Sequence, residues 1–257
     1  MNAQEFMKQM DHAAELARNA YMELAQTLEA SMRSGRQQIL AINEEAVTTY
    51  DLQLDLALVQ AAPVVAAPAN CEFYPLQENG HRFVVATNGV YLEARRPWLH
   101  FIHQISEFAG VTVPYGSITP KFELAFGRVG TALPQLREFA RHAQAAAPLE
   151  AAASIIWNSR LDAWRIEFPE IIGEATTASI RFQQPHLADD EHLVIDVHSH
   201  GHLDAFFSGV DDADDAGAVK IAGVVGNLDG VPTVAFRVCV LGVMIPLSVP
   251  ADKIFAD

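Results

Sequence analysis

A pair of histidines at the end of an apolar segment constrains this chain more than any other feature. Residues 193–197 (LVIDV) predict a short buried strand, and His198 and His200 follow it directly. Alternate residues of a strand point to the same side, so both imidazoles can reach one point in space. Asp211 follows after a segment long enough for a turn and the start of a helix. The pattern therefore predicts that two imidazoles and a carboxylate converge.

Two imidazoles and one carboxylate are a ligand set for catalytic zinc, because they leave the fourth position open for water. A structural zinc site would be closed by four protein ligands, and no cysteine lies nearby in the sequence. We therefore predict one Zn²⁺ per chain, bound by His198, His200 and Asp211. Water at such an ion has a pKa of about 7 and still needs a general base.

Other residues of the same segment are candidates for supporting roles. Ser208 is expected to donate to the oxyanion of a tetrahedral intermediate. Phe206 and Phe207 border the predicted site, and we expect one to pack into the core and the other to line the substrate groove. His202 is interpreted as a residue at the rim, since Gly201 interrupts the strand.

The chain is strongly acidic, with a formal net charge of -15 and a pI of about 5.0. Phosphate binding needs clustered Lys and Arg, so this charge argues against a primary role in holding nucleic acid. Asp212, Asp214 and Asp215 extend an acidic run after the metal motif. They either favour the first turn of a helix through its dipole or are simply solvated, and we favour solvation.

The sequence predicts a protein of the cytoplasm. Cys71 and Cys239 are too few for a disulfide framework, which favours a reducing compartment. The first residues mix charged and apolar side chains and do not resemble a signal peptide. The longest apolar stretch, residues 56–69, contains two prolines and is too short to cross a membrane.

Hydrophobic spacing divides the chain into four parts. Residues 1–60 are predicted to be an N-terminal helical extension, with a helix over residues 4–46 that carries an apolar stripe. Residues 61–81 are rich in Ala and Pro and are predicted to be a linker. Residues 82–130 are expected to form a strand-rich subdomain, and residues 131–257 the domain that carries the metal site.

Strands are predicted to outnumber helices after the linker. Asn88-Gly89 between two apolar runs indicates a hairpin of residues 82–86 and 90–94. A helix is expected over residues 97–108 after Pro97, and another between Pro134 and Pro148. Further strands are expected at residues 151–157, 163–168, 178–182, 219–225, 234–240 and 244–249. The fold class is therefore α/β.

The spacing of the motif resembles that of a known family. His198-Ser199-His200, followed after seven residues by Ser208 and after two more by Asp211, is similar to the JAMM motif of the MPN+ (Mov34/PAD-1) metalloproteases. Over roughly residues 130–249, the resemblance implies a curved mixed β-sheet flanked by helices and one catalytic zinc. It also implies hydrolysis of peptide or isopeptide bonds at the C-terminus of ubiquitin-like proteins.

The resemblance further implies a glutamate that serves as the base, on a strand shortly after the first helix of the domain. The candidates are Glu150, Glu167, Glu170 and Glu174. Glu150 directly follows the predicted helix and Pro148 and opens an apolar run, so we assign the base to Glu150.

Other segments are similar to protein A of the bacterial PRTRC cassettes, among them residues 88–99, the run AFFSGVDDADD and the later FRVCVLG. That resemblance covers about residues 80–255. It implies a ubiquitin-like substrate and an E1-like, ThiF-related partner. Two alternatives stay open: a catalytically idle MPN module that acts as a binding scaffold, and a zinc hydrolase of small peptides or amides.

Overall fold

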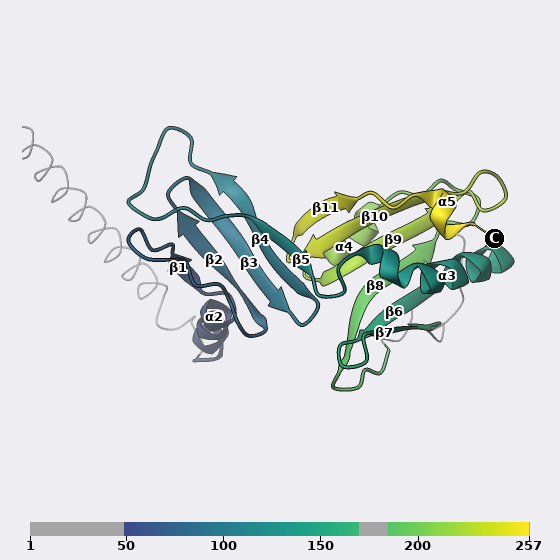
Figure 1. Ribbon diagram of the computed structural model, residues 1–257, viewed down its shortest axis with the longest axis horizontal. Helices are drawn as coiled ribbons and strands as arrows, with labels where there is room; N and C mark the ends of the chain where they lie inside the picture. The colour runs from purple at the N-terminus through teal and green to yellow at the C-terminus, as the bar shows by residue number, and fades with distance from the viewer. Residues whose placement is uncertain (1–48, 170–184, 257) are drawn as a thin grey trace, which may run out of the picture. The chain divides into compact units, whose positions relative to one another are not determined.

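The structure is a computed structural model that describes residues 49–169 and 185–256 (Figure 1). The chain divides into two compact units, Met1–Gln60 and Ala61–Asp257. The described residues start with the helix α2 (Thr49–Ala61). The helix predicted over residues 4–46 lies outside the described residues. Within the described ranges, no helix has the length and apolar character needed to span a bilayer.

Residues 64–124 form a five-stranded sheet with the strands in chain order. Its strands are β1 (Val64–Ala66), β2 (Gly80–Ala86), β3 (Gly89–Arg96), β4 (Leu99–Glu107) and β5 (Lys121–Leu124). β1 runs parallel to β2, and the other neighbours are antiparallel. The segment expected to be a linker thus contributes a strand to the sheet. Ala67 continues it, because its amide donates to the carbonyl of Val85 at 2.9 Å.

The predicted hairpin is confirmed as β2 and β3, but Gly89 belongs to β3 and not to the turn. The two connecting residues are Thr87 and Asn88, and Gly89 already pairs with Ala86. A Cβ on Gly89 would lie 2.1 Å from the carbonyl oxygen of Ser106 on β4. A side chain at this position would therefore push β4 away from β3.

The helix predicted over residues 97–108 is wrong, because this segment forms β4. Pro97 and Trp98 connect two strands, and the pairing of Arg96 with Leu99 closes the hairpin. β4 is hydrogen-bonded to β3 on one edge and to β5 on the other. Pairing on both edges satisfies the backbone of the segment, and this tertiary context outweighs a weak local preference for helix.

Residues 152–247 form a second, six-stranded sheet of order β11-β10-β9-β8-β6-β7. Its strands are β6 (Ala152–Asn158), β7 (Ala163–Glu167), β8 (Glu191–Ser199), β9 (Val219–Gly226), β10 (Thr233–Val240) and β11 (Val243–Leu247). Only β8 and β9 pair in parallel. Apart from shifts at the ends, the strands predicted here are confirmed, except that residues 178–182 lie outside the described residues.

Short helices accompany the second sheet. The 3₁₀ helix η1 (Val129–Ala132) leads into α3 (Leu133–Ala146), which has Pro134 in its first turn as predicted. The buried face of α3 consists of Leu136, Phe139, Ala140 and Ala143. The other helices are α4 (Gly209–Asp215) and α5 (Ala251–Ile254). The expected α/β class, with a mixed sheet and flanking helices, is confirmed.

The core of the second sheet lies under the strands that carry the metal motif. Ile155 of β6, Ile195 and Val197 of β8, and Ile221 of β9 have no exposed side-chain surface. These strands are paired with neighbours on both edges. Such positions cannot shift without opening the packed interior, so the residues at the end of β8 start from a rigid support.

Candidate metal centre

The end of β8 positions the two histidines. His198 is the penultimate residue of β8 and pairs with Val224 of the parallel strand β9. The backbone of His200 continues this pairing, because its amide donates to the carbonyl of Val225 at 2.9 Å. Two residues apart on an extended chain, both imidazoles lie on the same face of the sheet. His200 is buried and His198 is partly buried.

Asp211 is brought to the histidines by the first turn of α4. Ser208 caps this helix, and the two residues form a reciprocal capping box. The backbone amide and the hydroxyl of Ser208 donate to Oδ2 of Asp211 at 2.6 and 2.7 Å. Oδ1 of the same carboxylate lies 3.4 Å from Nε2 of His198. Ser208 thus holds one carboxylate oxygen and leaves the other facing the histidines.

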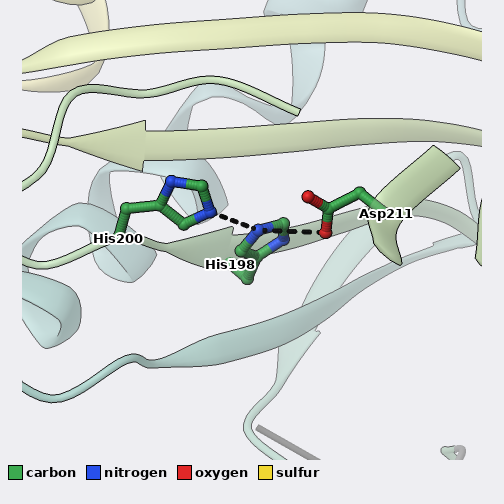
Figure 2. A group of neighbouring side chains, drawn as sticks. All are labelled: His198, His200 and Asp211. Carbon is green, nitrogen blue, oxygen red and sulfur yellow. Dashed lines mark hydrogen bonds and ion pairs between the residues drawn. The ribbon is translucent and has the colours of Figure 1, made fainter. Parts of the chain in front are cut away.

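The three side chains converge on one point (Figure 2). Nε2 of His198 lies 3.1 Å from Nε2 of His200, and their ligand atoms and that of Asp211 all lie within 4.8 Å of one another. Ligand atoms about 2.0–2.1 Å from a tetrahedral zinc ion are about 3.3–3.4 Å apart. The separations of His198 from His200 and from Asp211, 3.1 and 3.4 Å, are close to two edges of such a tetrahedron. The residues present therefore fit the predicted ion.

The electrostatics of the cluster favour the metal-binding form of His198. Burial lowers the pKa of His198, and the neighbouring His200 acts in the same direction, while Asp211 opposes them. A neutral imidazole has a free lone pair for a metal, whereas an imidazolium does not.

Cys239 lies outside the cluster. Burial, followed by the charge of Asp215, raises the pKa of its thiol to about 12.

Glu150 precedes β6 by two residues, and the register of β6 with β8 predicts that it faces the same side as the histidines. Ala152 pairs with His198 across the antiparallel strands β6 and β8. Residues directly opposite in such a pair point to the same face, and so do their neighbours two positions further along. Continuing this register from His198 to His200 brings Glu150 to that face. Burial, followed by the charge of Asp211, raises the pKa of Glu150 to about 6.

The structure separates Glu150 from the other candidates for the base. The carboxylate of Glu167 is engaged by Arg165, 2.6 Å away. Glu170 and Glu174 lie outside the described residues. Of the described candidates, Glu150 alone combines burial, a raised pKa and the correct face. A carboxyl group that titrates near neutral pH is suited to accept and return a proton.

The two phenylalanines lie on different sides of the motif. The ring of Phe206 meets that of His200 edge to face, with centroids 4.6 Å apart, and 49% of the residue is exposed. The ring of Phe207 instead lies under the guanidinium of Arg237, 3.8 Å from its centroid. Phe207 also lines a cavity of about 370 Å³ with Phe236 and Met244. Phe206 is therefore the one exposed beside the ligands.

His202 and Gly201 extend the motif beyond the ligands. His202 is half exposed, and its Nδ1 lies 3.6 Å from Oδ2 of Asp229, outside the ligand cluster. Gly201 has a φ of +55°, and a Cβ there would lie 2.6 Å from the carbonyl oxygen of Pro148. Just beyond the end of β8, the backbone at Gly201 thus comes close to the segment that carries Glu150.

A buried network of charges behind α4 was missed from the sequence. Asp215, expected to be solvated, is buried, and its carboxylate binds Arg237 at 2.7 Å and Lys220 at 2.7 Å. Arg237 also binds Asp212, and Lys220 binds Asp196 of β8 at 2.8 Å. Although burial opposes its charge, hydrogen bonds from Lys220 and Arg237 lower the pKa of Asp215.

This network ties the helix of the Asp211 ligand to the strand of the His198 ligand. Lys220 bridges Asp215 at the end of α4 and Asp196, two residues before His198. α4 has only seven residues, too few to be a stable helix by itself. The signal in the sequence was a single cation within each of two apolar strands, Lys220 in VKIAGVVG and Arg237 in TVAFRVCV. Such isolated charges need buried partners.

Replacing Asp215 by alanine is expected to destabilise the protein by about 3 kcal/mol, because it takes one partner from the buried Arg237 and one from the partly buried Lys220. The measurement is the free energy of unfolding from urea titration. Asp214→Ala provides the matched control, since Asp214 is an exposed carboxylate on the same helix, and it should change stability by less than about 0.5 kcal/mol. Equal effects of the two substitutions would contradict a buried network at Asp215.

The raised pKa of Glu150 predicts a pH-dependent effect of Glu150→Gln on stability. Because the folded pKa is about 6 and the usual value 4.5, the folded protein binds this proton more tightly than the unfolded chain. The wild type therefore loses stability as the pH rises from about 4.5 to about 6, by about 2 kcal/mol. In the presence of a chelator, the stability of the variant relative to wild type should rise by that amount between pH 4 and pH 7. Urea titrations at each pH measure it, and a constant difference would contradict the burial of a charge at Glu150.

Comparison with known protein families identifies two segments of the chain. Residues 133–239 match the family described as prokaryotic homologs of the JAB domain, and residues 52–125 match a domain of unknown function, DUF2016. No curated protein matches the chain. The first match contains all three candidate ligands, Glu150 and Ser208, and the mixed sheet around them agrees with a JAB/MPN-type fold. The two matches together agree with a JAB protein of the PRTRC protein A type.

Proposed function

We propose that this JAB-domain protein is a zinc-dependent metalloprotease that hydrolyses a peptide or isopeptide bond at the C-terminus of a ubiquitin-like protein. The observation that supports it most is the convergence of His198, His200 and Asp211 at separations suited to one zinc ion, with Glu150 on the same face. Only three ligands come from the described residues, which leaves a coordination position for water or substrate, as in catalytic rather than structural sites.

Zinc bound here would polarise the scissile carbonyl and lower the pKa of the attacking water to about 7. Glu150 accepts the proton of this water and returns it to the leaving amine. Its raised pKa fits both steps, since a group with a pKa near the working pH exchanges protons readily in either direction.

Ser208 is proposed to have two roles, and its contacts support the first of them. Its hydroxyl donates to Asp211, so Ser208 orients a ligand from outside the coordination shell. The second role follows from hydroxyl chemistry, because a hydroxyl beside the ion can donate to the oxyanion of a tetrahedral intermediate. In this chain that role requires the hydroxyl to turn from Asp211 towards the substrate.

The proposed substrate is the extended C-terminal tail of a ubiquitin-like protein, lying beside the motif strand. Phe206 offers an exposed apolar surface next to His200 for such a tail. The resemblance to PRTRC proteins supports the presence of an E1-like, ThiF-related partner that handles the same ubiquitin-like protein. Phe207 is proposed to act through the position of the motif loop, because its ring is stacked on Arg237.

The test is cleavage of linear and isopeptide-linked fusions to the ubiquitin-like protein of the cassette, with zinc content measured on the same preparation. We expect about one zinc per chain and release of the fusion partner, abolished by a chelator and restored by zinc. Substoichiometric zinc without cleavage would instead identify an idle scaffold. Turnover of small peptides or amides without cleavage of any fusion would indicate a different zinc hydrolase.

A further inference from the structure

The segment that carries Glu150 is held by the residue between the two histidines. Ser199 has no exposed surface. Its amide donates to the carbonyl of Ala151 at 2.8 Å, and the amide of Ala151 donates to the hydroxyl oxygen of Ser199 at 2.9 Å. Both hydrogen bonds therefore hold Ala151, the residue next to Glu150.

The second of these bonds departs from a regular sheet. A hydrogen-bonded pair in an antiparallel ladder exchanges two bonds between backbone groups. Here the side-chain oxygen of Ser199 accepts the hydrogen bond that the Ala151 amide would otherwise donate to a backbone carbonyl. Because Ala151 is 4% exposed, its amide has little access to water as a substitute partner. A residue without a hydroxyl at position 199 would leave this amide unsatisfied.

Little else holds the Glu150 carboxylate in place. Its pKa is shifted by burial and by the charge of Asp211, with no contribution from a hydrogen bond to a described residue. Its position therefore depends on the backbone on either side. On one side Pro148 is in close contact with Gly201, and on the other Ala151 is bound by Ser199.

We propose that Ser199 is a positioning residue that holds Glu150 at a fixed place relative to the zinc ligands. His198-Ser199-His200-Gly201 then has two tasks, since the histidines bind the ion and the residues beside them hold the base. The catalytic consequence rests on the proposed function, in which Glu150 is the base. The contact between Ser199 and Ala151 does not depend on it.

The test uses the full chain with Ser199→Ala and a matched control, Ser154→Ala. Ser154 is also a buried serine of the β6–β8 pair, opposite Asp196, and its hydroxyl oxygen has no partner among the described residues. Both substitutions remove a buried hydroxyl, but only the first removes an acceptor of a backbone bond. The measurements are hydrogen exchange of the Ala151 amide, zinc content, kcat and KM.

In Ser199→Ala we expect exchange of the Ala151 amide to become at least about 10-fold faster and kcat to fall by about 10- to 100-fold, because a small displacement of a reacting group is costly. Zinc content and KM should stay at the wild-type level. Ser154→Ala should match the wild type in all four measurements. Ser199→Thr, which keeps the hydroxyl, should restore slow exchange and kcat together.

Wild-type exchange in Ser199→Ala would overturn the contact, and fast exchange with wild-type kcat would overturn the positioning role. The positioning role would also be overturned if Ser199→Thr combined slow exchange with a kcat as low as that of Ser199→Ala. If the zinc-loaded wild type cleaves nothing, the proposed function fails instead. The exchange of the Ala151 amide then still decides whether Ser199 holds the segment.

Discussion

Glu150→Gln is expected to lower turnover by about 10²–10⁴-fold while the protein keeps about one zinc ion per chain. Glutamine has the shape of glutamate but cannot accept the proton of the attacking water. The proposed zinc ligands lie at the end of β8 and on α4, so the substitution should leave their positions intact. The measurement is kcat on a ubiquitin-like fusion, together with metal analysis of the same sample.

Glu167→Gln is the matched control for this experiment. Glu167 is also a glutamate of the same sheet, but its carboxylate is bound by Arg165. It should retain wild-type turnover. If Glu150→Gln were as active as the wild type, the base would have to be sought elsewhere, beginning with Glu170 and Glu174.

Asp211→Ala is expected to lose both the metal and the activity. Loss of a residue that hydrogen-bonds to a metal ligand typically weakens metal binding by about 10- to 100-fold. Loss of the ligand itself should weaken it more. The substitution also breaks the capping box with Ser208, so the first turn of α4 loses about 1 kcal/mol. A competition titration with a chromophoric chelator measures the affinity for zinc.

Thermal unfolding with and without zinc provides a second measurement on Asp211→Ala. A ligand that binds only the folded state raises Tm, so the wild type should unfold at a higher temperature with zinc than with a chelator. This difference should disappear in Asp211→Ala and persist in Asp214→Ala. A zinc-dependent rise in Tm of wild-type size in Asp211→Ala would contradict ligation by Asp211.

The sequence predicted the candidate ligands because their spacing is local. His198 lies at the end of β8, His200 comes two residues later, and Asp211 follows on the next connection, so the pattern appears within one short segment. Glu150 was harder, because its relation to the histidines depends on the pairing of Ala152 with His198 across two strands. Its assignment came from a family resemblance, and burial and the register now support it.

Features that depend on distant partners were missed or mistaken. β4 was predicted as a helix because Pro97 begins helices as readily as it connects strands, and only pairing with β3 and β5 decides between them. Asp215 was predicted to be solvated because it belongs to an acidic run. Its partners Lys220 and Arg237 come from two later strands, and no local pattern identifies which aspartate they bind.

The parallel pairing of β8 and β9 has a consequence for folding. Two parallel neighbours cannot be joined by a tight turn, so the chain between them must travel back along the sheet. His198 belongs to β8 and His200 follows it directly, whereas Asp211 belongs to this return path. Under the proposed function, binding of the ion would therefore close a loop in the chain and offset part of the conformational entropy lost in ordering the connection. The metal-free protein should accordingly open first between β8 and β9, because the proposed ion would join the end of β8 to α4 as well as take part in the reaction.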